Sequence, residues 1–122
     1  MSFDDFERQV MSHILREQTE QNIRLLQQYD TAKIVSREFT GCGFFTDFSI
    51  SNETLALPGN GNIELGCLGE LEGVEHGVGF ILFVRNGIIT VLEGFVYTGA
   101  WPEVIGNFQL MDSGSKPSVF NP

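Results

Sequence analysis

A single carboxylate lies in the most hydrophobic part of this chain. Residues 78–95 read VGFILFVRNGIITVLEGF, and Glu93 is the one acid among them. Burial disfavours the charged form of a carboxylate, unless a base pairs with it. A carboxyl group that holds its proton in apolar surroundings can act as a general acid or base, so Glu93 is the candidate catalytic residue of this sequence.

A hairpin turn predicts where Glu93 lies. Asn86-Gly87 separates two apolar runs, and this dipeptide is the strongest short signal for a two-residue β-hairpin turn. Counting outward from that turn places Glu93 opposite Phe80, on a face that is otherwise apolar. The same register pairs Gly79 with Gly94 beside them, and this pair either leaves a hollow next to the carboxylate or lets the sheet coil tightly.

Two structural alternatives for Glu93 stay open beside the catalytic one. A β-bulge at Gly94 would turn the carboxylate out to solvent, because one extra residue reverses the side-chain direction. Glu93 would otherwise form a buried ion pair with a base from another element. The available bases are Arg24, Lys33 and Arg37.

A second group of polar side chains precedes the hairpin. The segment ELEGVEHG holds Glu70, Glu72, Glu75 and His76, and carboxylates with an imidazole can bind a divalent cation. Their spacing matches no defined metal-binding loop, and alternation places Glu70 and Glu72 on the wet side of a strand. We therefore predict no metal site, and we keep Glu72, Glu75 and His76 as candidate binding residues.

Aromatic side chains flank the turn after the hairpin. In VYTGAWPE, Tyr97 and Trp101 stand on either side of Thr98-Gly99-Ala100, and Glu103 follows. Aromatic residues at strand ends commonly close a core. They are also the residue types that anchor binding surfaces, so Tyr97, Trp101 and Glu103 are further binding candidates.

No other motif in the sequence indicates catalysis. Cys42 and Cys67 each lie in an apolar run, without another Cys or His at metal-ligand spacing, and we predict that both are small buried side chains. The chain has no Gly-x-Ser-x-Gly elbow, Walker loop or dinucleotide fingerprint. We therefore predict no cofactor.

The elements that hold these residues fall into two parts. Apolar residues at helical spacing over residues 3–29 predict one long helix of about 40 Å, which begins at an N-cap Ser2 with Asp5 three residues on. Such a helix either breaks near EQTEQN or extends to another subunit. All 14 glycines follow residue 40, and there the pattern alternates. Strands are predicted at 34–39, 42–50, 63–72, 78–85, 88–97 and 104–111.

These patterns predict one α+β domain over residues 1–122, with a helical segment at 1–32 and a β-rich segment at 33–122. A long N-terminal helix would pack on a coiled, mostly antiparallel sheet of five to six strands. In layout this is similar to cystatin-like and hot-dog folds. The hairpin is apolar on both faces, so both faces should be covered, one by the helix and the other by a bent part of the sheet or a second subunit.

The charge of the chain limits its partners. The net charge is −9, and residues 41–122 hold nine acids against two bases, which disfavours nucleic acid and favours a basic protein. The longest apolar run has seven residues, too few to span a membrane, and the acidic start does not resemble a signal peptide. We therefore expect a cytoplasmic protein.

Three functions are compatible with these observations. The first is a non-enzymatic protein-binding module with a basic partner, since in charge and size the chain is similar to small acidic immunity proteins that neutralise basic toxins. The second is a small-molecule-binding or weakly catalytic pocket between helix and sheet that uses Glu93. The third is a homodimer joined through the spare apolar face of the hairpin.

Overall fold

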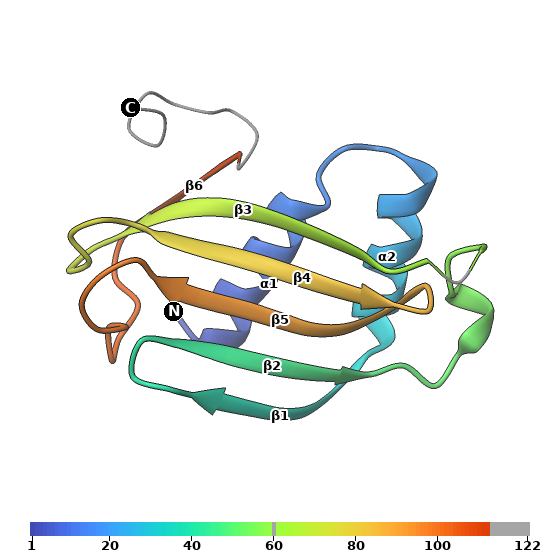
Figure 1. The fold of residues 1–122 in the computed structure, drawn as a ribbon, viewed down its shortest axis with the longest axis horizontal. Coiled ribbons are helices and arrows are strands. Elements are labelled where there is room, and N and C mark those ends of the chain that lie inside the picture. The colour runs from blue at the N-terminus through green and yellow to red at the C-terminus, as the bar shows by residue number, and fades with distance from the viewer. Residues whose placement is uncertain (60, 113–122) are drawn as a thin grey trace.

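Two helices pack on one face of a six-stranded antiparallel sheet (Figure 1). The computed structural model describes residues 1–59 and 61–112, so the end of the predicted β-rich segment, 113–122, lies outside the described residues. The strand order is β1-β2-β5-β4-β3-β6, which confirms an α+β fold with an antiparallel sheet. The strands are β1 (Lys33–Phe39), β2 (Gly43–Ser49), β3 (Ile63–Leu71), β4 (Val78–Arg85), β5 (Ile88–Val96) and β6 (Phe108–Asp112). A 3-10 turn, η1 (Glu53–Leu55), precedes β3.

The predicted long helix is wrong, because the chain breaks it into two. Helix α1 (Phe3–Ile14) begins at the predicted N-cap, where the Ser2 hydroxyl accepts a hydrogen bond from the Asp5 backbone N–H at 3.1 Å. Helix α2 (Glu20–Thr31) begins at Thr19, whose hydroxyl accepts from the Asn22 backbone N–H at 3.1 Å. This second cap lies within EQTEQN, where a break was the first alternative. Neither helix is long and apolar enough to cross a membrane.

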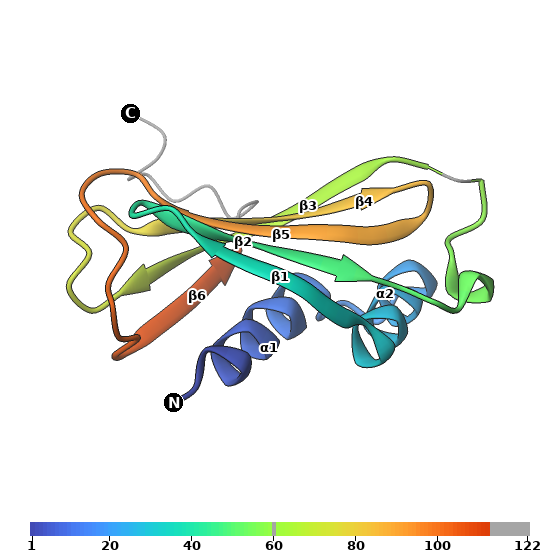
Figure 2. The same cartoon turned by 90° about the horizontal axis from the view of Figure 1, so that it is seen from below.

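The core lies between the helices and the sheet face that they cover, which we call the inner face (Figure 2). Alternate residues of β2, β4 and β5 point into it, as the period of two requires. Each buried Leu or Phe contributes about 2 kcal/mol of hydrophobic free energy. The fully buried apolar side chains are Phe6, Val10, Met11, Leu15, Leu25, Phe44, Val78, Leu82, Val84, Ile89 and Leu92.

Trp101 belongs to this core and is not a surface residue. Its side chain is 9% exposed, and its ring lies 5.2 Å from that of Phe44 and 6.3 Å from those of Phe6 and Phe80. The Trp101 backbone N–H donates to the carbonyl of Gly41 at 2.9 Å. The interpretation that this aromatic residue closes the core therefore holds, and the structure removes Trp101 from the candidate binding surface.

The register of the hairpin departs from the prediction after two pairs. Asn86 has a positive φ of 55°, as the predicted turn requires, and Arg85 lies opposite Ile88. The register then skips Thr90, which is a β-bulge, and every later pair shifts by one residue. Glu93 consequently lies opposite Ile81 and not opposite Phe80.

The predicted pair of glycines is also wrong, and no hollow forms between them. Gly94 lies opposite Phe80 on the inner face, where a Cβ atom would collide with the ring of Phe44. Gly79 lies on the other face, where a Cβ atom would lie 2.5 Å from the ring of Phe95 and 3.0 Å from the Tyr97 hydroxyl. Each glycine therefore makes room for aromatic rings on its own side of the sheet.

Candidate functional site

The face of the sheet that points away from the helices, the outer face, is apolar at its centre. No helix or strand within residues 1–59 and 61–112 covers it, so a bent part of the sheet, one of the two covers predicted for the hairpin, is not found there (Figure 2). Its side chains are half-buried by their neighbours in the sheet. The apolar ones, identified by the strand registers, are Phe45, Leu68, Ile81, Phe83, Ile88, Val91, Phe95 and Met111.

Carboxylates surround this apolar strip. The registers place Glu38, Asp47, Glu64, Glu70 and Glu93 on the outer face, against two bases. One base, Arg85, is occupied, because its Nη2 lies 2.8 Å from a carboxylate oxygen of Glu64. The other, Lys33, lies at the edge of the sheet, on β1. The outer face therefore combines exposed apolar area with an excess of negative charge.

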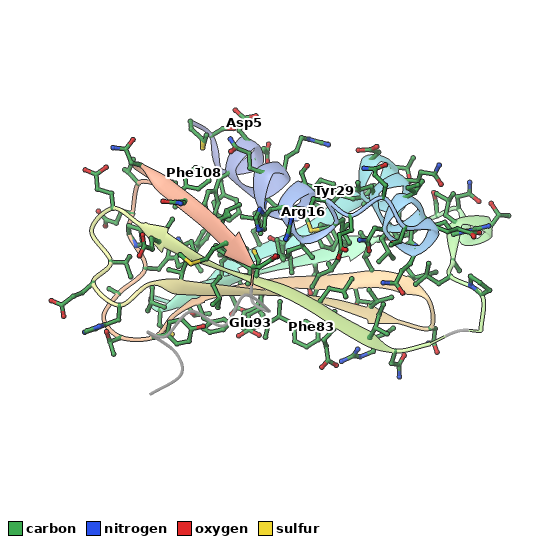
Figure 3. The ribbon with its side chains drawn as sticks, turned by 90° about the horizontal axis from the view of Figure 1, so that it is seen from above. Asp5, Arg16, Tyr29, Phe83, Glu93 and Phe108 are labelled. Atoms are coloured by element: carbon green, nitrogen blue, oxygen red, sulfur yellow. The ribbon has the colours of Figure 1, made fainter. Side chains whose placement is uncertain are left out.

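Glu93 lies in the middle of this face. It is flanked by Phe45 on β2 and Ile81 on β4, and Figure 3 shows Glu93, like Phe83, on the side of the sheet away from the helices. A β-bulge therefore does turn Glu93 to the other face, as one alternative predicted, but the bulge is at Thr90 and not at Gly94.

The ion-pair alternative for Glu93 is wrong within the described part of the chain. Arg37 pairs with Glu7 and Asp4, Arg24 lies 3.9 Å from Glu20, and no base lies within ion-pair distance of Glu93. Glu93 also lines neither cleft found among the described residues. Glu93 adds a negative charge to the outer face, diagonally across from Asp47 on β2.

Two aromatic rings extend the apolar strip toward one end of the sheet. The rings of Phe95 and Tyr97 meet edge to face with centroids 5.5 Å apart, over the space that Gly79 leaves free. Tyr97 is 45% exposed, and partial burial raises its pKa. The prediction that Tyr97 is available to a partner is compatible with this position.

A cleft of about 1050 Å³ adjoins this end of the sheet, between the β3–β4 turn and β6. The structure brings four of the predicted binding residues to its wall, whereas Glu103 and Trp101 do not line it. Its apolar walls include Leu71, Val74, Phe108 and Met111. The predicted residues that meet there are Glu72, Glu75, His76 and Tyr97.

Two of these acids already have partners. A carboxylate oxygen of Glu72 accepts from the Asn107 backbone N–H at 3.0 Å, and this contact holds the loop that leads into β6. Glu75 lies 2.9 Å from His76 on the exposed turn. No group of three or more His, Cys, Asp or Glu side chains among the described residues is placed to hold a metal ion. The cleft is therefore a groove beside the outer face, with an acidic rim.

Comparisons with known protein families, curated proteins and solved structures found no match. The function is therefore inferred from the surface itself.

One buried carboxylate, Glu7, was not among the residues that the sequence singled out. Its side chain is 1% exposed, and it accepts from the Tyr29 hydroxyl at 3.0 Å and from two guanidinium nitrogens of Arg37 at 3.0 and 3.3 Å. Glu7 lies four residues after Phe3 and four before Met11, which is a spacing that marks one helix face. That signal was present in the sequence.

This cluster is structural. It joins α1, α2 and β1 through one carboxylate, and a second acid, Asp4, lies 2.7 Å from the Arg37 guanidinium. The hydroxyl and the guanidinium that face Glu7 are both bonded, as buried polar groups require. Among the side chains that the structure describes, Glu7 is the one buried acid, and its partners account for its position.

The two cysteines differ in exposure. Cys67 is buried as predicted, and burial raises the pKa of its thiol to about 12. Cys42 is exposed, so the prediction that both are buried is wrong for this residue. It lies in the β1–β2 turn, before the strand begins.

A thiol reagent is therefore expected to modify one cysteine of the folded protein and both after denaturation. A reagent can reach the exposed Cys42, whereas Cys67 is buried and its raised pKa keeps the thiol protonated, which is the unreactive form. A Cys42→Ser variant should give no rapid reaction in a colorimetric thiol assay. Rapid modification of that variant would contradict the burial of Cys67.

Proposed function

We propose that this protein is a non-enzymatic protein-binding module, and that a basic protein docks on the outer face of its sheet. The observation that carries the proposal is a half-buried apolar strip that no described helix or strand covers, with carboxylates beside it that have no basic partner among the described residues. These carboxylates are Asp47, Glu70 and Glu93. Protein interfaces commonly combine an apolar, aromatic centre with a polar rim.

Charge selects the kind of partner. A cationic protein is attracted by the net charge of −9 and pairs with these carboxylates on contact. A second copy docked face to face would bring two acidic surfaces together, and a nucleic acid would bring its phosphates against them. A basic toxin that this protein neutralises is one partner with the required chemistry.

A reversal of charge on the outer face tests this proposal. The tagged wild-type chain is expressed in its own cells and captured at low salt, and bound proteins are identified by mass spectrometry. We expect a basic protein, and we expect Glu93→Lys to weaken its binding by about tenfold or more, because a like charge then faces the partner. Binding of the purified pair is measured by calorimetry at low and high salt.

The matched control is Glu17→Lys, which makes the same charge change on an exposed residue between the two helices. This control should bind as the wild type does. A captured protein that is not basic, or binding that Glu93→Lys and strong salt leave unchanged, would refute the outer face as the docking site.

A further inference from the structure

Strand β1 forms one edge of the sheet and carries exposed apolar side chains. Beyond β1 there is no further strand in the described part of the chain (Figure 1). Val35 is 65% exposed, Phe39 56% and Ile34 41%. An edge strand presents unpaired backbone donors and acceptors, so a long apolar edge is a template for pairing with another strand.

The charge of this edge differs from that of the rest of the chain. β1 holds one acid, Glu38, and two bases, of which Arg37 is already paired with Glu7 and Asp4 of α1, so that Lys33 is left to balance Glu38. The chain as a whole has a net charge of −9, so most of its surface repels a second copy. The β1 edge is a place where two copies can meet without that repulsion.

The side chains of β1 follow the same order of faces from its first residue onward as from Glu38 backward. Lys33 and Glu38 both lie on the outer face, and Ile34 and Arg37 both lie on the inner face. The register with β2 is irregular at Val35, and this bulge gives residues five apart the same direction. In a regular strand, Lys33 and Glu38 would point to opposite faces.

We propose that the β1 edges of two copies pair antiparallel about a two-fold axis and join the two sheets into one. A two-fold interface is self-complementary, and this register brings each lysine opposite the glutamate of the other copy, on the same face. The pairs across the axis are Ala32–Phe39, Lys33–Glu38, Ile34–Arg37 and Val35–Ser36. This dimer forms through the edge of the sheet, so it differs from a homodimer joined through the apolar face of the hairpin. It also does not depend on the basic protein proposed above.

The test measures the mass of the full chain in solution and its response to charge reversal. Sedimentation equilibrium should give twice the 13.6 kDa of one chain. Glu38→Lys should raise the dimer dissociation constant by roughly 30-fold, because two attractive cross-strand pairs become repulsive. The double variant Lys33→Glu/Glu38→Lys should restore the wild-type constant, since the charges are exchanged. Glu70→Lys, on β3, is the control and should leave the constant unchanged.

Three outcomes would overturn the inference. A monomer at every concentration would show that the bulge and charges protect this edge from pairing. A dimer that Glu38→Lys leaves intact would be formed through another surface. A double variant as weak as the single one would exclude the Lys33–Glu38 pairs, provided that circular dichroism shows both variants to be folded.

Discussion

Replacement of Trp101 by alanine is expected to lower the free energy of unfolding by about 4 kcal/mol. The indole packs against the rings of Phe6, Phe44 and Phe80 in the core, so the truncation leaves a cavity that these rings cannot fill. Urea denaturation followed by far-ultraviolet circular dichroism measures the change. The midpoint should fall while the slope with denaturant stays the same.

Two control variants separate the core role of Trp101 from a binding role. Trp101→Phe keeps an aromatic ring in the same place and should lose less stability than the alanine variant. Tyr97→Ala removes a ring that is nearly half exposed and should cost about 1 kcal/mol or less. A Trp101→Ala protein as stable as the wild type would contradict its place in the core.

Replacement of Glu7 by alanine is expected to cost about 3 kcal/mol of stability. The change leaves the Tyr29 hydroxyl and one face of the Arg37 guanidinium without their partner. The cost stays at the lower end for a broken buried pair, because Arg37 keeps its contact with Asp4 and is partly exposed. Urea denaturation at neutral pH measures it. Glu17→Ala, at an exposed position, is the control and should change stability by about 0.5 kcal/mol or less.

The phenol of Tyr29 provides a second measurement of the same cluster. Burial raises the pKa of Tyr29, and the charge of Glu7 raises it further. The folded state therefore holds this proton more tightly than the unfolded state, so stability is unaffected below about pH 10 and falls as the pH rises above it. Glu7→Gln keeps a hydrogen-bond acceptor but removes the charge, so Tyr29 should titrate at a lower pH by ultraviolet absorbance. An unchanged titration would contradict the contact.

Local signals in the sequence predicted most of the elements. Ser2 caps α1 because its hydroxyl needs only the backbone three residues on, and the Asn86-Gly87 turn needs only positive φ at adjacent positions. The alternation of apolar and polar residues is also a local signal, and it located the strands. The exception is β6, which begins at Phe108, four residues later than predicted. The one error in the helices was local too, since the Thr19 cap was not recognised.

The position of the candidate site depended on one residue. Because strand side chains alternate with a period of two, the bulge at Thr90 moves Glu93 from the predicted inner face to the outer face. No motif in the sequence marks Thr90 as a bulge. Which residues lie on the outer face, where the docking surface is proposed, could be assigned only once the register was known.

By itself, the sequence determined the α+β class, the antiparallel strands, the hairpin turn and the acidic net charge. Each depends on composition or on residues a few positions apart. The tertiary structure decided which side chains are buried. Glu7 lies in the core because Tyr29 and Arg37, 22 and 30 residues away, satisfy it, and Trp101 lies there because three distant rings surround it. Burial is a property of neighbours in space, and these neighbours come together only when the sheet and both helices pack.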